Sequence, residues 1–508
     1  MSLAIAHIAS EMAPLAKVGG LGDVVGALAP EQARRGHRVT VALPAYRSLD
    51  VPESWRRRAI GGCNVPWGMG HEPARFELIE PPQGGPQVLL IDHAGERRFF
   101  DRLGIYDDPR SGEGYSDNAE RFLFFARGAL EGLTRLEQRF DVLHGHDHQA
   151  AWVPCFVRAH DAYERAFGAA ATVFTIHNLG YQGIHDPWVL GLAGFGRELF
   201  YPSGPFEFWG RVNYMKVGIA FSDMLSTVSP RYAREIQANG EFGFGLEGVL
   251  ARRSEDLRGI LNGIDEEVWN PARDAYLPQP YDAESLDLKA INTRALAGEC
   301  GFLDSPGWPL VGMVSRLAEQ KGFDLVEQAR DELTRLEARF VVLGSGHPRY
   351  QELFRSLMSR FPHRVHYRSG HDERLAHLIE GGSDVFLMPS RYEPCGLNQM
   401  YSMRYGTAPV VRAVGGLADT VEEFDSLTRQ GSGFLFQKFN AAEMLGGLRH
   451  ALAIHRQPTL WRALQKNAMS RDFSWRKSAD GYDALYAEAR ERVAQGRIRT
   501  LERVRTTI

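Results

Sequence analysis

The sequence predicts an α/β protein made of two doubly wound, Rossmann-like domains. Short apolar runs alternate with longer amphipathic segments along almost the whole chain, as expected for parallel strands joined by right-handed helical crossovers. At 508 residues the chain is also too long for a single compact core. In addition, two similar glycine-rich segments, 19–25 and 415–421, each follow an apolar strand and open a helix, one in each half of the chain.

The apolar runs give the expected strands in order. In the first half they are 3–10, 38–44, 87–92, 140–146 and 171–178, and in the second half 309–316, 339–346, 363–369, 384–390 and 408–414. Segment 225–262 contains a helix, a glycine-rich loop and the run ILNGID, which places a domain boundary between 255 and 275. We therefore expect domains over 1–255 and 256–475, followed by a helix over 476–508 whose arginine-rich end is a solvated face.

Composition excludes several classes of function. Hydrophobic residues make up 44% and charged residues 24%, as in an ordinary globular protein, and the formal net charge is -4. Nothing in that balance favours nucleic acid or an anionic membrane as a partner. Four scattered cysteines without a CxxC pair, an N-terminus without a basic signal-peptide region, and apolar runs too short for a membrane helix together predict a cytoplasmic protein.

The segment EMAPLAKVGGLGDVVGALA, residues 11–29, has features of a dinucleotide-binding turn. Gly20 and Gly22 fit the GxGxxG pattern, but Val25 stands where the third glycine belongs. The expected strand also ends well before the first glycine, and the next strand ends in Pro44 with no carboxylate for a ribose. These departures disfavour NAD, while a helix N-terminus after glycines still suits another anion.

Positively charged residues suited to binding phosphate lie near the expected helix starts and strand ends. Lys17 precedes the first glycine pair, and Arg316 and Lys321 follow the strand 309–316, where open α/β sheets bind ligands. A guanidinium can hold two phosphate oxygens, and an ammonium acts as a compact point charge. Together they would neutralise a diphosphate leaving group.

Other polar residues also follow predicted strands. The run HGHDHQA, 144–150, does not match a zinc-binding spacing, so Asp147 is interpreted as a loop carboxylate at the mouth of a sheet. His177 ends another strand, where a packing role and a catalytic one are both open. Glu393 precedes a helix, which it could cap, and it could also hydrogen-bond sugar hydroxyls near a reacting carbon.

Taken together, seven segments resemble the bacterial glycogen synthase and plant starch synthase family. In order they are SEMAPLAKVGGLGDV, HGHDHQA, FTIHNLGYQG, LNGID, VSRLAEQKG, PSRYEPCGLNQMY and VGGLADTV, and the resemblance extends to about residue 475. It implies the GT-B fold, with an acceptor-side first domain, a second domain that binds the nucleotide sugar, an active site in the cleft between them, and a final helix that returns to the first domain. It further implies transfer of glucose from ADP-glucose to the non-reducing 4-hydroxyl of an α-1,4-glucan such as glycogen, with retention and with neither metal nor cofactor.

The resemblance also implies roles for individual residues. The residues implied to be catalytic are Glu393, His177, Asp147, Lys321 and Arg316. Those implied to bind substrate are Lys17, Gly19, Gly20, Asn262, Cys395, Gly396, Leu397, Gly416, His371 and Thr420. Retention without an evident nucleophile favours a front-face route, in which the departing diphosphate accepts the acceptor's proton, and Asp147 is the candidate for a rival double displacement.

The chain departs from the family at two places. It has His148 and Gln149 where bacterial members commonly have tryptophan and histidine, and His371 where a tyrosine often stacks on adenine. UDP-glucose as donor and a short oligosaccharide as acceptor therefore remain alternatives. A glucan-binding protein without catalysis is a further one, against which the retained lysines, arginine, histidine and glutamate argue. The sequence predicts no oligomeric state.

Overall fold

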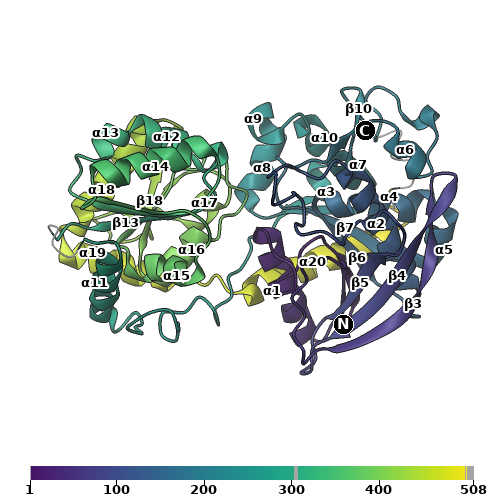
Figure 1. Ribbon diagram of the computed structural model, residues 1–508, viewed down its shortest axis with the longest axis horizontal. Coiled ribbons are helices and arrows are strands. Elements are labelled where there is room, and N and C mark those ends of the chain that lie inside the picture. Colours follow the sequence, from purple (N-terminus) through teal and green to yellow (C-terminus); the bar gives the residue numbers. More distant parts are fainter. Residues whose placement is uncertain (1, 303–306, 498, 500–508) are drawn as a thin grey trace. The chain divides into compact units, whose positions relative to one another are not determined.

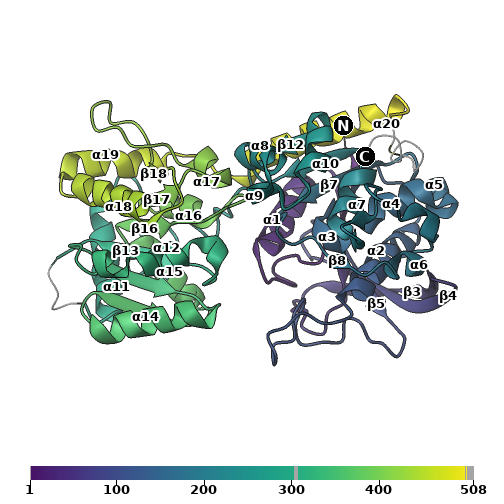
Figure 2. The ribbon, with the colours of Figure 1, turned by 90° about the horizontal axis from the view of Figure 1, so that it is seen from above.

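The computed structural model describes residues 2–302, 307–497 and 499, and the chain folds into two compact α/β units (Figures 1 and 2). Unit 1 contains the chain up to Val228, Ala233–Ile260 and the described residues from Trp475 on. Unit 2 contains Ser229–Tyr232 and Leu261–Ser474. The two-domain α/β fold class predicted from the sequence is confirmed.

Unit 1 is built on a nine-stranded sheet in which seven consecutive strands are parallel. In spatial order the strands are β12 (Leu257–Gly259), β11 (Met224–Thr227), β7 (Ala171–Ile176), β6 (Val142–His146), β1 (Ala4–Ile8), β2 (Arg38–Pro44), β5 (Gln87–His93), β4 (Gly70–Glu80) and β3 (Arg56–Trp67). The last two pair antiparallel and form a ribbon at one edge of the sheet (Figure 1). A small antiparallel sheet has the order β8 (Ile184–His185), β10 (Arg211–Asn213), β9 (Glu207–Phe208).

Helices connect these strands. They are α1 (Gly20–Arg34), α2 (Asn118–Thr134), α3 (Asp147–Ala150), α4 (Trp152–Ala159), α5 (Asp161–Phe167), α6 (Val189–Leu192), α7 (Tyr214–Phe221), α8 (Pro230–Ala238), α9 (Gly240–Gly243) and α10 (Glu247–Arg252). Short 3₁₀ turns cover Arg197–Leu199 and Ser254–Asp256. The central parallel strands β1, β6 and β7 are buried from end to end, since helices cover both faces of such a sheet.

Unit 2 is built on a six-stranded parallel sheet. Its spatial order is β15 (Val365–Arg368), β14 (Arg339–Leu343), β13 (Leu310–Val314), β16 (Val385–Met388), β17 (Ala408–Arg412), β18 (Phe434–Phe436). Its helices are α11 (Lys289–Glu299), α12 (Phe323–Gln328), α13 (Arg330–Leu333), α14 (Pro348–Arg360), α15 (Glu373–Gly382), α16 (Asn398–Arg404), α17 (Gly415–Thr420), α18 (Ala441–His455) and α19 (Pro458–Met469), with 3₁₀ turns at Leu286–Leu288 and Glu319–Lys321.

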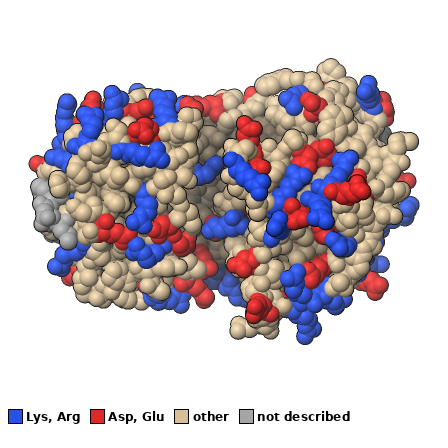
Figure 3. Space-filling model, in the orientation of Figure 1, with Lys and Arg blue, Asp and Glu red and all other residues tan. Residues whose placement is uncertain are grey.

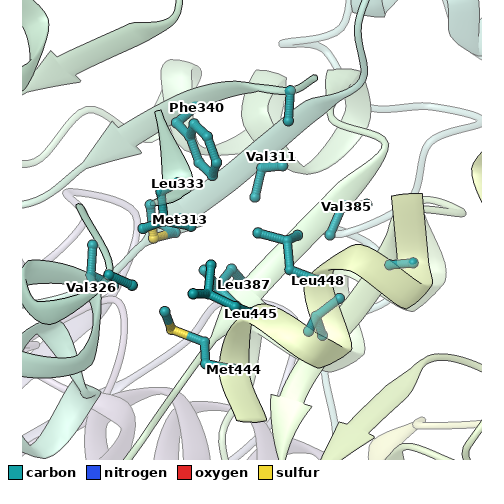
Figure 4. Packing of buried hydrophobic residues seen from close by; sticks show 14 of the residues in the cluster. Val311, Met313, Val326, Leu333, Phe340, Val385, Leu387, Met444, Leu445 and Leu448 are labelled. Carbon is teal, nitrogen blue, oxygen red and sulfur yellow. The ribbon is translucent and has the colours of Figure 1, made fainter. Parts of the chain in front are cut away.

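The core of unit 2 forms where α18 packs on the sheet. Val311, Phe340 and Val385 project from adjacent strands toward Met444 and Leu448 of the helix (Figure 4). All five side chains are buried, and each buried aliphatic or aromatic side chain contributes about 1.5–3 kcal/mol relative to exposure. The same apolar runs that predicted strands from the sequence therefore also supply the core.

The last helix, α20 (Trp475–Ala494), belongs to unit 1 although it follows the whole of unit 2 in the chain. It packs against α1 and β7, and it is drawn in yellow in Figure 1. Its buried face includes Tyr482, Leu485 and Tyr486, which join the core around β1, β6 and β7. The prediction for 498 and 500–508 within the expected final helix lies outside the described residues.

The distribution of charged side chains on the surface agrees with the modest net charge. Basic and acidic side chains are interspersed on both units in the face that Figure 3 shows. No helix within 2–302, 307–497 and 499 is long and apolar enough to cross a membrane.

Candidate active site

In unit 1, the carboxyl ends of three neighbouring strands gather the residues expected to be functional. Strands β7, β6 and β1 are adjacent and parallel, so the segments that leave them meet at one edge of the sheet. The chain continues from β1 into the loop with Lys17, from β6 into Asp147, and from β7 into His177. Open α/β sheets bind ligands at this edge.

Asp147 and His177 are brought into direct contact there. Oδ1 of Asp147 accepts hydrogen bonds from the backbone N–H of His177 at 2.7 Å and of Asn178 at 3.4 Å. Burial raises the pKa of Asp147 to about 7, although those two N–H groups act in the opposite direction. Burial lowers the pKa of His177 to about 3, so its imidazole is neutral. Asp147 also adopts a left-handed backbone conformation, with φ of 54°, which is uncommon for a residue other than glycine.

A residue that sequence reasoning missed, Glu11, organises the loop between β1 and α1. Its Oε2 accepts hydrogen bonds from the backbone N–H groups of Val18 at 2.6 Å and Gly19 at 2.8 Å. Its Oε1 accepts one from the hydroxyl of Tyr106 at 2.6 Å, and the glutamate is buried. Glu11 lies in the SEMAP segment that carries part of the family resemblance, which could have drawn attention to it. Its contact with Tyr106 could not be predicted, because no sequence pattern links residues so far apart in the chain.

Lys17 and the glycines of this loop remain accessible. The Lys17 ammonium lies 2.7 Å from Asp23 of α1, and nearly half of its side chain is exposed. Gly19 is the N-cap of α1 and Gly20 its first residue, as the predicted helix start requires. Gly26 has a packing role that does not depend on a dinucleotide, because a Cβ there would lie 2.5 Å from the carbonyl oxygen of Ala13. This glycine lets the loop pack against the helix.

Residues that follow Asp147 and His177 in the chain help to line a cavity of about 720 Å³ in unit 1. It is lined by His148, Phe208, Trp209, Arg211, Phe244 and the loop 180–184. Trp209 is 81% exposed and Tyr181 49% exposed, so two aromatic rings are available to a ligand. Nδ1 of His148 lies 3.0 Å from the carbonyl oxygen of Tyr181.

Three histidines of unit 1 have a spacing that a metal ion could bridge. The ligand atoms of His7, His144 and His146 lie within 4.8 Å of one another. Every ring nitrogen of the three, however, already lies within hydrogen-bond distance of a protein partner. A metal would have to displace the existing partner of one nitrogen on each ring, so the donor set fits a hydrogen-bond network better than a metal centre.

In unit 2, the strand ends of β13, β16 and β17 form the corresponding edge. Lys321 Nζ donates to Glu393 Oε2 at 2.6 Å, and Ser390 Oγ donates to the same oxygen at 3.0 Å. Glu393 is 5% exposed, and Lys321 retains about a fifth of its side-chain exposure. Two residues that lie 72 positions apart are thus held within one hydrogen bond, as an ion pair at the ligand-binding edge.

The loop after Glu393 packs against the second glycine pair. A Cβ on Gly416 would lie 2.2 Å from the carbonyl oxygen of Cys395, so only glycine allows this approach. Burial raises the pKa of the Cys395 thiol to about 12, while the backbone N–H of Asn262 hydrogen-bonds it. The thiol is therefore uncharged at neutral pH and no nucleophile. Thr420 closes the cluster internally, since its Oγ1 donates to the carbonyl oxygen of Gly416 at 2.6 Å.

The remaining residues expected in unit 2 differ in exposure. Gly396 has φ of 75°, and Leu397 is the N-cap of α16. The side-chain oxygen of Asn262 is buried and has no hydrogen-bond partner within the described chain. Arg316 is exposed in the turn after β13, and His371 is 84% exposed, 3.2 Å from Glu373, after β15.

Comparison with known proteins gives a consistent family. The family model described as starch synthase catalytic domain matches residues 4–252, and the model described as glycosyl transferases group 1 matches residues 305–469. A protein of Koribacter versatilis named glycogen synthase is 44% identical over 489 residues, covering 96% of this chain and 98% of that protein. A glycogen synthase of Anaeromyxobacter sp. strain Fw109-5 is 46% identical, covering 95% and 98% of the two chains.

Solved structures agree with these sequence relatives. The catalytic domain of starch synthase IV from Arabidopsis thaliana, bound to ADP and acarbose, has a TM-score of 0.87 and 36% identity. The match covers 97% of this chain and all of that one. A sucrose-phosphate synthase from Thermosynechococcus elongatus, with a TM-score of 0.57 and 18% identity, shares the fold. The chain therefore belongs to the glycogen synthase and starch synthase family of GT-B glycosyltransferases.

Proposed function

We propose that this enzyme transfers glucose from ADP-glucose to the non-reducing 4-hydroxyl of an α-1,4-glucan such as glycogen, with retention and without a metal or other cofactor. The observation that carries the proposal is the Lys321–Glu393 pair. In a nucleotide sugar a phosphate oxygen is bonded directly to the anomeric carbon, so its site needs a cation for the phosphate beside a group that accepts hydrogen bonds from the sugar hydroxyls. In this proposal Lys321 is the cation and the Glu393 carboxylate accepts those hydrogen bonds.

The charged and ionisable side chains of the candidate site favour a front-face route. Breaking the bond between C1 and the diphosphate oxygen leaves negative charge on ADP, and in this proposal Lys321 and Arg316 stabilise that charge. The acceptor oxygen bonds to C1 on the face that ADP leaves, and its proton passes to a phosphate oxygen. Asp147 is a poor nucleophile for the rival double displacement, because burial raises its pKa to about 7 and Oδ1 is held by two N–H groups.

The cavity of unit 1 suits the acceptor glucan. Sugars stack their apolar faces on aromatic rings, and Trp209 and Tyr181 present such rings beside the edge that carries His177. The four free cysteines are compatible with a reducing, cytoplasmic location for both substrates.

The test is incorporation of labelled glucose into glycogen from ADP-glucose, with UDP-glucose in parallel. We expect turnover with ADP-glucose, and a Trp209→Ala variant that raises the KM for glycogen while leaving the KM for ADP-glucose unchanged. Turnover with UDP-glucose alone would replace the donor in this proposal. Glycogen binding with no turnover of either donor would refute the proposed function and favour the glucan-binding alternative.

A further inference from the structure

A row of hydrogen-bonded side chains leads from His177 into the interior of unit 1. His177 Nε2 lies 2.9 Å from His146 Nδ1, His146 Nε2 lies 2.9 Å from His7 Nδ1, and His7 Nε2 lies 2.7 Å from Gln32 Oε1. All four residues are buried, and the three beyond His177 are inaccessible to solvent. We call this row, Gln32, His7, His146 and His177, the histidine relay.

The imidazoles of the relay are neutral. Burial lowers the pKa of His177 to about 3 and that of His7 to about 4, and it lowers the pKa of His146 well below its ordinary value. A neutral imidazole carries one N–H and one lone pair. Each ring must therefore donate on one side and accept on the other, so the whole relay has a direction.

Gln32 sets that direction. Its Oε1 can only accept, so Nε2 of His7 carries the hydrogen and Nδ1 of His7 accepts from His146. His146 then accepts on Nδ1 from the Nε2–H of His177. This leaves a lone pair on Nδ1 of His177, which makes no hydrogen bond to any residue within 2–302, 307–497 and 499.

The Gln32 amide also joins a second network. Its Nε2 donates to the hydroxyl of Tyr486 in α20 at 3.0 Å, and that hydroxyl donates to Nδ1 of His144 at 2.8 Å. The Nε2–H of His144 donates in turn to Thr175 Oγ1 at 2.6 Å. Turning the amide over would reverse every hydrogen bond on both sides of it, so one amide controls the tautomer of His177.

We propose that the histidine relay holds His177 in its Nε2–H form, so that Nδ1 accepts a hydrogen bond from a hydroxyl of the transferred sugar. Gln32, His7 and His146 are positioning residues, because they act on the substrate only through His177. The identity of the ligand as a sugar rests on the proposed function, whereas the tautomer does not.

The direct test is the ¹⁵N NMR spectrum of the full chain labelled at histidine, without ligand and at neutral pH. The ring signals of His177 are identified by their loss in His177→Gln. We expect a protonated Nε2 and an unprotonated Nδ1, since the two states have widely separated ¹⁵N shifts. A protonated Nδ1 in the unaltered protein would overturn the proposal, whatever the variants do.

The variant Gln32→Leu tests control by the amide. Without the Oε1 acceptor, we expect the His177 signals to move toward a mixture of tautomers and kcat/KM for the nucleotide sugar to fall about tenfold. Gln465→Leu is the matched control, because Gln465 is a buried glutamine of unit 2 that donates to the carbonyl oxygen of Gly406 at 2.9 Å. Unchanged His177 signals in folded Gln32→Leu would contradict the proposal.

Deoxy analogues of the donor sugar identify the hydroxyl. For the analogue that lacks the hydroxyl bound by Nδ1, Gln32→Leu should cause no further loss of kcat/KM, because the contact is already absent. Additive losses with every analogue would contradict the sugar contact. If no nucleotide glucose is turned over at all while His177 keeps the expected tautomer, the proposed function fails and the relay stands.

Discussion

At the scale of single residues, the groups expected to touch substrate are held by one another. In unit 2 the Lys321 ammonium and the Glu393 carboxylate form one ion pair, and in unit 1 Asp147 holds the backbone of His177. A ligand that enters either edge therefore meets side chains whose positions are already fixed. Such preorganisation is the main way in which an enzyme stabilises a departing diphosphate.

The variant Glu393→Gln tests the role of the carboxylate. The amide keeps the size of the side chain, but it removes the charge that orients Lys321 and that we propose holds sugar hydroxyls, so we expect kcat to fall about 100-fold. The control is Glu327→Gln, which removes a carboxylate from an exposed pair with Arg349 in the same unit. Equal rates for the two variants in glucosyl transfer would show that Glu393 is only structural.

The variant Glu11→Gln tests the loop after β1. The amide can keep one oxygen for Val18 and Gly19, but it loses the negative charge that strengthens those hydrogen bonds, and its NH2 group forces the Tyr106 hydroxyl to stop donating to this side chain. We expect kcat/KM for ADP-glucose to fall about tenfold. Glu31→Gln, in α1 beside Arg34 and Arg35, removes the same charge and should leave the rate unchanged. A normal rate for Glu11→Gln would refute the role of Glu11.

At the scale of elements, continuous apolar runs made the parallel strands predictable. Every run named from the sequence contains a strand, because both faces of such a strand are buried and its residues are nearly all apolar. The ribbon of β3 and β4 was missed. Most of β3 is exposed and begins with three arginines, 56–58, so no apolar run marks it.

The site was predictable to a similar extent and for a similar reason. Asp147 and His177 stand directly after strands, Lys321 and Glu393 lie in the loops that follow strands, and the sheet topology brings such positions to one edge in each unit. The relay and the Glu11 contact were not predictable. They depend on which buried side chains meet across segments, and His7 gave no signal beyond one polar residue within a strand.

An aromatic stack in unit 2 makes one element sensitive to pH. Trp269 lies between His377 of α15 and Tyr401 of α16, with ring centroids 3.8 Å apart on each side. Burial alone would lower the pKa of His377, but hydrogen bonds to Asp274 and Glu373 outweigh burial and raise the pKa to about 9. His377 thus stays protonated in the folded state at pH values where the unfolded chain loses that proton.

We predict that this histidine stabilises unit 2 by about 3 kcal/mol below pH ~6.5, and that the contribution is lost as pH rises through about 9. The measurement is the free energy of unfolding against pH for the unaltered chain and for His377→Gln. Because Glu380 and Lys289 also titrate in this unit, the difference between the two curves isolates His377. A difference that stays constant from pH ~6 to ~10 would contradict the assignment.

At the scale of the whole molecule, α20 completes unit 1 from the far end of the chain. Leu485 is buried in the unit 1 core, so Leu485→Ala should destabilise that unit by about 3 kcal/mol. We expect faster hydrogen exchange in peptides from β6 and β7 and unchanged exchange in peptides from β13 and β16. Leu464→Ala, at a buried site of unit 2, should give the opposite pattern. Equal effects of both variants on both units would show that the chain unfolds as one body.

At the same scale, this chain is a glycosyltransferase of the glycogen synthase and starch synthase family. Its family, the Lys321–Glu393 pair and the Asp147–His177 contact all favour one reaction. The most direct measurement is the initial rate of glucose incorporation from labelled ADP-glucose into glycogen by the purified protein. We predict saturable incorporation that Glu393→Gln lowers about 100-fold. Incorporation from neither ADP-glucose nor UDP-glucose by the folded protein would contradict the account.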